Sequence, residues 1–330
     1  MKTRQLGYSD LYLTEIGFGS WAIGGGNWEF GWGPQDDKDA VNAIRASFDL
    51  GINWIDTAAV YGLGHSEELV AEAVKGKRSD VIIATKCSLI WDDRRRIGSS
   101  LKADSVRKEC EASLKRLNTD YIDLYQIHWP NDDIHIEEGW EEIGKLIEEG
   151  KVRYGGVSNF LDTHMKRAQA IHPIASLQPP YSILRRHIEE AEIDYCRDNQ
   201  IGIVAYSPMQ SGLLTGKFDP ANLGENDWRL KSSEFLPPNL DINLEFIEKL
   251  RELSNDLDCT VAQLAVAWTL RLPEITSSIV GARRPDQIQE TAKAADVKLS
   301  DDVQNQIEIW LVEREEKLKE KDGYIFAVQR

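Results

Sequence analysis

Short apolar segments alternate with amphipathic segments along most of the chain. Eight apolar segments are rich in β-branched residues and bounded by turn or helix-start residues, as is typical of buried strands: residues 16–23, 52–58, 80–86, 121–129, 152–159, 175–181, 201–208 and 276–282. Apolar residues recur with a helical period in residues 37–50, 65–74, 103–117, 136–149, 162–171, 188–199, 244–257 and 285–295. We therefore expect eight strands, each followed by a helix.

The repeated order of strand and helix predicts a single (β/α)8 TIM barrel. No linker or low-complexity stretch divides residues 1–330, so the whole chain is expected to form one domain. A doubly wound open sheet is the alternative fold. At the helix starts, Asp104 is expected to act as an N-cap and Pro285 to occupy a first turn.

Three segments extend the expected barrel. The amino terminus is expected to form a β-hairpin with its turn at residues 7–10. Two connections are long: residues 24–36 follow the first strand, and residues 209–239 follow the seventh. Long loops in compact domains are usually functional, and active sites of such barrels lie at the carboxyl ends of the strands. Both loops are therefore expected to border the site.

Composition and charge narrow the possible partners. The 330 residues include 39 basic and 55 acidic ones, a net charge of −16, which disfavours nucleic acid and anionic membranes as partners. No apolar stretch reaches the about 18 residues of a membrane-spanning helix, and no apolar core of a secretory signal follows the amino terminus. The four cysteines are widely spaced and the histidines lack metal-ligand spacing, which predicts a cytoplasmic protein without a metal site.

Polar residues stand at the ends of three neighbouring predicted strands. Asp56 ends the second strand and is followed by Tyr61, Lys86 ends the third, and His128 ends the fourth. Each alone is more often a salt bridge, a cap or a packing residue, but four together indicate a site. A nearby ammonium lowers the pKa of a phenol, a carboxylate balances the ammonium, and an imidazole polarises a carbonyl. The set suits proton donation to a carbonyl oxygen whose carbon receives hydride.

These residues stand in motifs that resemble the aldo-keto reductase superfamily. The motifs, in order along the chain, are GFGSW (17–21), DTAAVYG (56–62), IATK (83–86), YIDLYQIHWP (121–130) and TSSIVGARRPDQIQE (276–290). Within the superfamily, the chain is similar to bacterial, stress-associated NADPH-dependent reductases. The resemblance implies that Tyr61 is the general acid. It also implies that Lys86 and Asp56 tune this acid and that His128 orients the carbonyl.

The resemblance further implies how a nicotinamide cofactor is held. Its nicotinamide and ribose are expected near Gly19, Ser20, Trp21, Asp56, Ser158, Asn159, Gln178 and the stacking ring of Tyr206. Its diphosphate is expected along Ser207, Pro208, Met209, Gly212, Leu213 and Lys217, and its adenine near Gln287 and Glu290. Thr291 stands where the family usually has asparagine, which weakens the adenine assignment.

The last predicted strand runs into the segment GARRPDQIQE, which opens a helix. A helix amino terminus attracts anions, and Gly281, Arg283 and Arg284 stand just before it in an otherwise acidic chain. This focus of positive charge suits the 2′-phosphate of NADP(H), so NADPH is expected in preference to NADH. The alternative is a surface arginine pair that faces Asp286 or Glu290.

Aromatic residues gather in the expected loops. The candidates for a substrate pocket are Trp28, Trp32, Trp91 and Trp129, with Phe30 and Trp228 in the two long loops. Apolar walls around a few polar groups are usual in ligand pockets, so an apolar or aromatic aldehyde is the expected substrate. Packing within the fold is the alternative role for each of these residues.

The residues and the resemblance together predict an NADPH-dependent oxidoreductase that reduces aldehydes or ketones to alcohols. One alternative is an NADPH-binding regulatory subunit with little turnover. A second is a barrel enzyme of other chemistry, such as a hydrolase or an aldolase that forms a Schiff base at Lys86. The physiological carbonyl or alcohol substrate, the direction of the reaction and the choice between monomer and homo-oligomer stay open.

Overall fold

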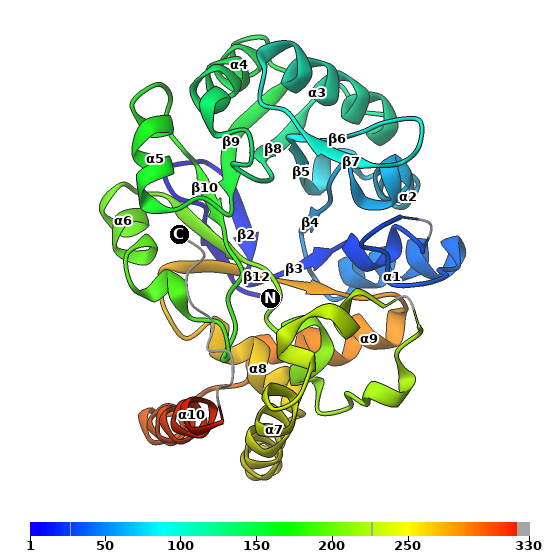
Figure 1. Cartoon of the computed structure of the whole chain (residues 1–330). Coiled ribbons are helices and arrows are strands. Elements are labelled where there is room, and N and C mark those ends of the chain that lie inside the picture. The colour runs from blue at the N-terminus through cyan, green and yellow to red at the C-terminus, as the bar shows by residue number, and fades with distance from the viewer. Residues whose placement is uncertain (27, 226, 322–330) are drawn as a thin grey trace.

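Eight parallel strands close into a barrel, as the alternating pattern predicts (Figure 1). The computed structural model describes residues 1–321 apart from Asn27 and Asn226. In chain order around the barrel, the strands are β3 (Ile16–Gly19), β4 (Trp54–Asp56), β5 (Ile82–Cys87), β8 (Ile122–Ile127), β9 (Val152–Ser158), β10 (Ser176–Gln178), β11 (Gly202–Ala205) and β12 (Ile275–Gly281). Strand β12 pairs with β3 and closes the ring. Each strand overlaps its predicted segment.

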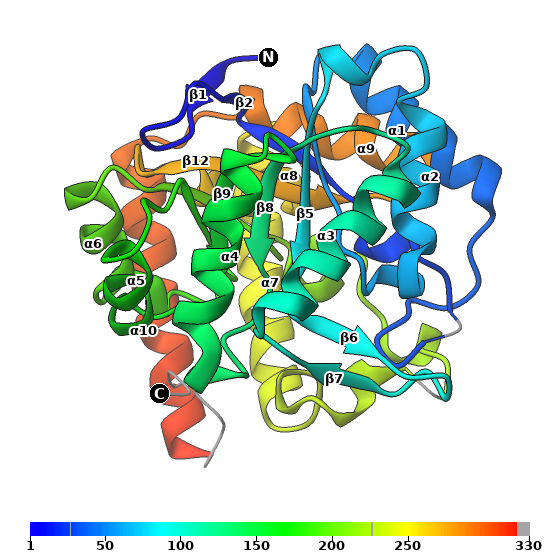
Figure 2. The same cartoon turned by 90° about the horizontal axis from the view of Figure 1, so that it is seen from above.

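Helices cover the outside of the barrel (Figure 2). The eight that overlap predicted segments are α1 (Asp37–Asp49), α2 (His65–Ala73), α3 (Ala103–Leu117), α4 (Ile136–Glu148), α5 (Asp162–Gln169), α6 (Glu192–Asp198), α7 (Asn239–Asp256) and α9 (Pro285–Thr291). The expected cap at Asp104 is wrong, because α3 begins at Ala103 with Lys102 at the cap, so Asp104 lies inside the first turn. Pro285 occupies the first turn of α9, as predicted.

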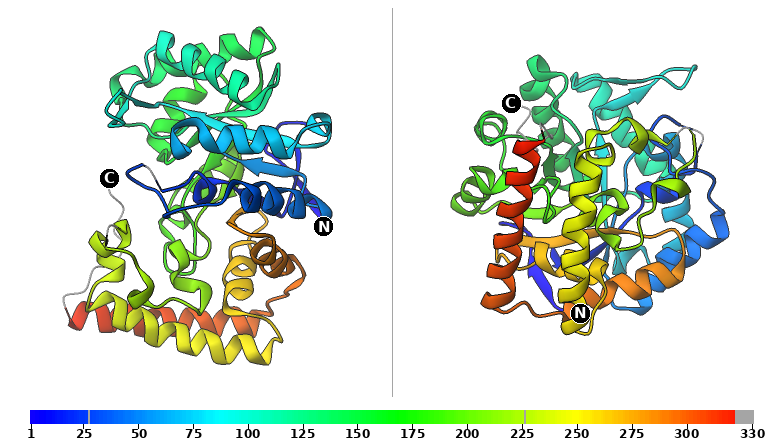
Figure 3. Two further views of the ribbon diagram at one scale, coloured as in Figure 1. Left: turned by 90° about the vertical axis from the view of Figure 1, so that its right-hand side faces the viewer. Right: turned by 60° about the horizontal axis from the view of Figure 1, so that its bottom comes forward.

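Two helices lie outside the predicted set, α8 (Val261–Thr269) and α10 (Asp301–Glu320). All nine residues of α8 are buried, so its sequence has no polar face from which a helical period could be detected. Its start is fixed by a reciprocal cap, in which Thr260 and Gln263 each accept the other's backbone N–H. Helix α10 packs beside α7 (Figure 3), where the buried Arg314 donates to Asn243 Oδ1 at 2.7 Å.

A predicted hairpin fills the amino-terminal end of the barrel. It consists of β1 (Thr3–Gln5) and β2 (Tyr12–Thr14), and its Leu6, Leu11 and Leu13 are buried in the core inside the barrel. Trp54 lies in the same core, with its indole N–H 3.1 Å from Ser277 Oγ. Apolar side chains thus occupy this end, and the cavity lies at the opposite end of the strands.

A second hairpin, β6 (Leu89–Trp91) with β7 (Ile97–Ser99), follows β5 and was not predicted. It lies at the carboxyl face of the barrel beside the two long loops (Figure 2). The remaining short elements are 3-10 helices at Trp21–Ile23, Tyr61–Gly64, Arg78–Asp80, Asp133–His135, His187–Glu189, Gln210–Thr215, Pro220–Asn222, Trp228–Lys231, Ser233–Phe235 and Ala292–Asp296. Among the described residues, no helix is long and apolar enough to cross a membrane.

Candidate active site

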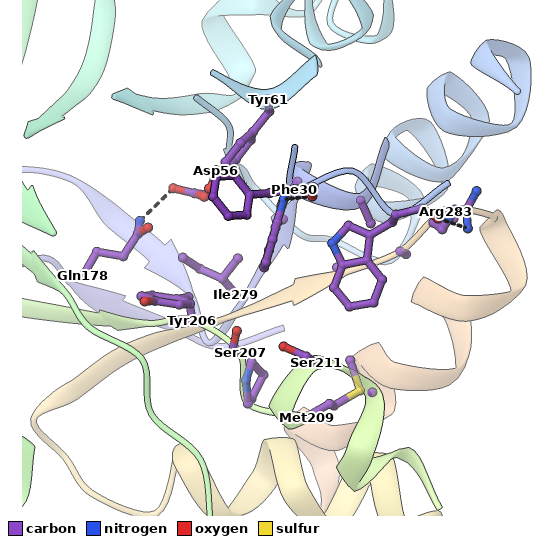
Figure 4. Close-up of a pocket in the computed structure, with 18 of the residues that line it drawn as sticks. Phe30, Asp56, Tyr61, Gln178, Tyr206, Ser207, Met209, Ser211, Ile279 and Arg283 are labelled. Atoms are coloured by element: carbon purple, nitrogen blue, oxygen red, sulfur yellow. Dashed lines mark hydrogen bonds between the residues drawn. The ribbon is translucent and has the colours of Figure 1, made fainter. Parts of the chain in front are cut away.

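A cavity of about 950 Å³ lies at the carboxyl ends of the barrel strands, bordered by the two long loops. Residues at strand ends form its base, and loop residues form its walls. Figure 4 shows Asp56, Tyr61 and Gln178 on one side of this cavity and Arg283 on the other. The cavity therefore occupies the face on which barrel enzymes carry their active sites.

Most of the residues that the sequence assigns to the site line this cavity. They are Gly19, Trp21, Trp28, Trp32, Asp56, Tyr61, His128, Trp129, Ser158, Asn159, Gln178, Tyr206, Ser207, Pro208, Met209, Gly212, Lys217, Gly281, Arg283, Gln287 and Glu290. Lys86 is not part of the lining, because it lies buried in contact with Asp56 and Tyr61.

Three other assigned residues lie away from the cavity lining. The fully buried Ser20 Oγ accepts a hydrogen bond from Ser66 Oγ at 2.8 Å, which ties two chain segments together. Leu213 is fully buried in the hydrophobic core. Trp91 faces Arg116, whose guanidinium lies 6.0 Å from the centre of the indole ring. The contacts described for these three side chains therefore lie within the fold and outside the described cavity lining.

The first chemical feature of the cavity is a buried ion pair beneath Tyr61. The Lys86 ammonium donates to both carboxylate oxygens of Asp56, at 2.8 and 2.7 Å, and to the backbone oxygen of Thr57 at 2.8 Å. The same ammonium lies 3.3 Å from the Tyr61 hydroxyl. Adjacent parallel strands β4 and β5 hold Asp56 and Lys86 in this register. The ion pair therefore fixes a charged group directly against the phenol.

The electrostatic environment differs from the sequence-based expectation for Tyr61. Burial raises the pKa of Tyr61 well above its ordinary value, and the charges of Asp56 and Tyr206 add to this effect. Burial also lowers the pKa of Lys86, although Asp56 opposes that change. Desolvation therefore changes the Tyr61 pKa in the direction opposite to the lowering that is expected from the ammonium. Tyr61 carries its proton at neutral pH, as an acid must before it donates.

His128 follows β8 and faces the phenol edge-on. The centres of the His128 and Tyr61 rings are 5.7 Å apart. Burial, followed by the charge of Lys86, lowers the pKa of His128 well below its ordinary value. The imidazole is thus neutral at pH 7 and has one N–H to donate. The backbone of His128 is held on both sides. Its backbone N–H donates to Cys87 O at 3.0 Å, and its backbone oxygen accepts from Asn159 Nδ2 at 2.9 Å.

A connected group of amides and hydroxyls lies beside the ion pair. Gln178, at the end of β10, donates to Asp56 Oδ1 at 2.7 Å. Ser158, at the end of β9, donates to the backbone oxygen of Gln178 at 2.8 Å. The Tyr206 hydroxyl donates to Asn159 Oδ1 at 2.8 Å. Four barrel strands are therefore joined at their carboxyl ends through side chains that border one cavity.

Positive charge collects at the other end of the cavity. Lys217 lies 3.1 Å from both carboxylate oxygens of Glu290, so the loop after β11 is joined to α9. Arg283 lines the cavity, whereas Arg284 is paired with Asp286 at 3.2 Å and is absent from the described lining. The surface-pair alternative thus applies to Arg284 and not to Arg283.

Helix α9 contributes less positive potential to this end of the cavity than its sequence predicts. It spans seven residues, and the side-chain oxygen of Gln287 accepts the backbone N–H of Arg283 at 2.7 Å. A helix of about two turns carries a small dipole, so attraction of an anion here depends mainly on the arginine.

The donor set along the cavity fits a dinucleotide. Neutral amides of Asn159 and Gln178 lie near the phenol, the ring of Tyr206 lines the middle, and the cations Lys217 and Arg283 lie beyond it. A nicotinamide is neutral at its amide, and the diphosphate and any 2′-phosphate are anionic. The residues present could therefore hold such a cofactor. Among the described residues, no group of histidine, cysteine or carboxylate side chains could hold a metal ion.

Aromatic residues surround the phenol. The rings of Trp28 and Tyr61 are 6.2 Å apart, and Trp21 stacks on Tyr61 at 6.4 Å. Trp129 lines the cavity with about a third of its surface exposed, at 36%. Three of the four proposed pocket tryptophans thus border the cavity, and Trp91 does not.

Sequence reasoning missed several residues of the cavity wall. Leu89 and Ile97 come from the unpredicted hairpin, and Val60, Asn131 and Arg229 come from loops. The hairpin strands have three residues each, which is too short for a period of two to be distinguished from a loop. For the loop residues, no sequence pattern indicates which side chains turn inward.

Comparison with known proteins places the chain among related sequences and structures. A family model described as the Aldo/keto reductase family matches residues 15–311. The aldo-keto reductase YhdN of Bacillus subtilis is 38% identical over 93% of this chain and 92% of its own length. The NADH-specific methylglyoxal reductase of Escherichia coli is 34% identical over 91% of this chain and 95% of its own length. The structure of the glycerol dehydrogenase AKR11B4 from Gluconobacter oxydans has a TM-score of 0.87 at 34% identity and covers 95% of this chain and 96% of its own.

Proposed function

The chain belongs to the aldo/keto reductase family of oxidoreductases that act on carbonyl compounds, and from this premise we propose that it reduces aldehydes or ketones to alcohols with NADPH. The observation that carries the proposal is the position of the Tyr61 hydroxyl, which lies 3.3 Å from the Lys86 ammonium and borders the cavity. The complete set of Asp56, Tyr61, Lys86 and His128 supports an enzyme over a regulatory subunit.

The roles of the four residues follow from their contacts. Tyr61 donates the proton that the carbonyl oxygen takes up, and Lys86 stabilises the phenolate that remains. Asp56 holds the ammonium in place. The neutral imidazole of His128 donates a hydrogen bond that polarises the carbonyl. A nicotinamide held by Ser158, Asn159, Gln178 and Tyr206 would supply the hydride for the carbonyl carbon.

The preference for NADPH is supported by Arg283, the cation that lines the cavity at the end remote from Tyr61. A guanidinium suits a phosphate because it offers several N–H groups in a fixed plane. The names of the relatives do not all indicate NADPH, since one of them is an NADH-specific enzyme. We therefore base the preference on the arginine.

The direct test is the loss of NADPH absorbance with purified protein and a panel of aliphatic, aromatic and dicarbonyl substrates, run in parallel with NADH. Turnover that is faster with NADPH is the expected result. Tight NADPH binding without turnover of any substrate would contradict the enzyme proposal and favour the regulatory alternative. Covalent trapping of a carbonyl on Lys86 by borohydride would instead favour Schiff-base chemistry.

Replacing Arg283 by Ala is expected to weaken NADPH binding about 10- to 100-fold, because one charge-assisted contact with a phosphate is lost. Binding of NADH, which lacks the 2′-phosphate, is expected to change much less. Fluorescence titration with both nucleotides measures the two dissociation constants. Arg284→Ala removes the same charge one residue along, outside the described lining, and serves as the matched control. Equal weakening of NADPH and NADH by Arg283→Ala would show that this residue does not distinguish them.

Replacing Trp28 by Ala is expected to raise the KM for an aromatic aldehyde about tenfold, since the indole faces the phenol and its apolar surface would be lost to the substrate. The KM for NADPH is expected to stay near the wild-type value. Steady-state kinetics with Trp310→Ala, a change of the same type on α10, provides the control. An unchanged aldehyde KM would remove Trp28 from the substrate wall.

A further inference from the structure

The side chain of Arg283 is attached to the first long loop, residues 24–36. Its Nε donates to Gln35 Oε1 at 2.7 Å, and its Nη1 donates to the backbone oxygen of Trp32 at 3.1 Å. Its Nη2 donates to the backbone oxygen of Pro34. Gln35 completes the contact in the other direction, with Nε2 donating to the Arg283 backbone oxygen at 3.1 Å. One arginine just after β12 therefore binds three residues of a loop about 250 positions earlier in the chain.

Arg283 can hold this loop and still bind an anion. A guanidinium has five N–H groups, and each terminal nitrogen carries two of them. The contacts to Trp32 and Pro34 use one N–H of each terminal nitrogen, which leaves one further N–H on each. Because Arg283 also lines the cavity, the same guanidinium can contact the loop and a phosphate together.

The loop that Arg283 holds carries part of the aromatic wall. Trp28, Phe30 and Trp32 all line the cavity. The described residues of the loop form neither helix nor strand, so side-chain contacts fix its position. Apart from Arg283, these contacts include Trp21 Nε1 donating to Phe30 O at 3.1 Å and Arg229 lying 4.7 Å from the Trp32 ring centre. The bonds from Arg283 are thus among the contacts that position the wall near the phenol.

We propose that Arg283 is a positioning residue for the carbonyl substrate as well as a contact for the cofactor. Through Trp32, Pro34 and Gln35 it holds the loop in the conformation in which Trp28 and Phe30 face Tyr61. A phosphate on the same guanidinium restrains that arginine further, so the nucleotide and the carbonyl site are energetically linked. The link to catalysis depends on the proposed reductase function, whereas the hold on the loop does not.

The test uses Gln35, because its side chain contacts Arg283 and is not among the described residues of the cavity lining. In Gln35→Ala, amide hydrogen exchange of residues 28–33 in the full-length protein without nucleotide is expected to be faster than in wild type. Gln306→Ala on α10 is the matched control, since none of the described residues of that helix lines the cavity. Unchanged exchange in both Gln35→Ala and Arg283→Ala would overturn the proposal. This measurement requires no turnover, so its outcome is independent of the proposed function.

The kinetic part is run at saturating NADH, which has no 2′-phosphate. Gln35→Ala removes both hydrogen bonds between Gln35 and Arg283. It is expected to raise the KM for an aromatic aldehyde about 2- to 10-fold, with a smaller change in kcat. Gln35→Glu keeps the acceptor for Arg283 Nε but loses the donor to the Arg283 backbone oxygen, so it is expected to restore part of the wild-type KM. A fall in kcat at constant KM, or no rescue by Gln35→Glu, would contradict a positioning role. Absence of turnover in the wild type with both NADH and NADPH would count against the reductase function alone.

Discussion

Tyr61→Phe is expected to lower kcat for carbonyl reduction by about 10²- to 10⁴-fold, the usual contribution of a general acid. The substitution removes one hydroxyl and leaves the ring that packs against Trp21, Trp28 and His128. The affinity for NADPH is therefore expected to stay close to the wild-type value. Single-turnover kinetics and a nucleotide titration measure the two effects separately.

Tyr125→Phe provides a matched control for this substitution. Tyr125 is fully buried in the core, and its hydroxyl lies 3.5 Å from the backbone oxygen of Val106, away from the cavity. Its loss is expected to leave kcat near the wild-type value. Substantial carbonyl reduction by Tyr61→Phe would show that the proton comes from another donor, and the assigned role would then be wrong.

Lys86→Met is expected to lower the free energy of unfolding by about 3–5 kcal/mol, because it leaves the buried carboxylate of Asp56 without its counter-charge. Both members of the pair are almost fully buried, with side-chain exposures of 0% and 4%. The double variant Lys86→Met with Asp56→Leu removes the uncompensated charge and is expected to regain most of this stability. Urea denaturation measures the difference, and both variants are expected to lose activity.

Lys145→Met serves as a control, because it removes an exposed lysine and measures the stability lost without a buried ion pair. Lys145 lies 3.5 Å from Glu141 on the exposed face of α4, and an exposed pair of this kind is worth at most about 1 kcal/mol. If Lys86→Met costs no more stability than Lys145→Met, the buried pair does not contribute to the fold in the way we infer.

The sequence predicts the barrel well because the strand-helix alternation repeats eight times. Sequence-based prediction fails for elements whose apolar residues show no helical or strand periodicity. Helix α8 is buried on every side, and β6 and β7 are three residues long, so neither produces a pattern that differs from its neighbours. The misplacement of Trp91 follows from the same cause, because its position depends on the undetected hairpin.

At the site, residue identities could be predicted but their environments could not. Asp56, Tyr61, Lys86 and His128 were found because parallel strands end on one face. The raised pKa of Tyr61 results from burial by segments far apart in the chain, which composition and spacing do not report. Likewise, nothing in two adjacent arginines indicates that only Arg283 turns toward the cavity. That difference arises from its contacts with Trp32, Pro34 and Gln35.

The hairpin at the amino-terminal end has a consequence for proton supply. Leu6, Leu11 and Leu13 fill that end, and Tyr61 borders the cavity at the other end. A nucleotide and a carbonyl bound in that cavity would occupy the space beside Tyr61. If Tyr61 is the general acid we propose, the proton that it donates would be replaced from solvent after the alcohol has left, once in every catalytic cycle. Because the hairpin fills the other end of the barrel, reprotonation of Tyr61 would follow the release of the alcohol product.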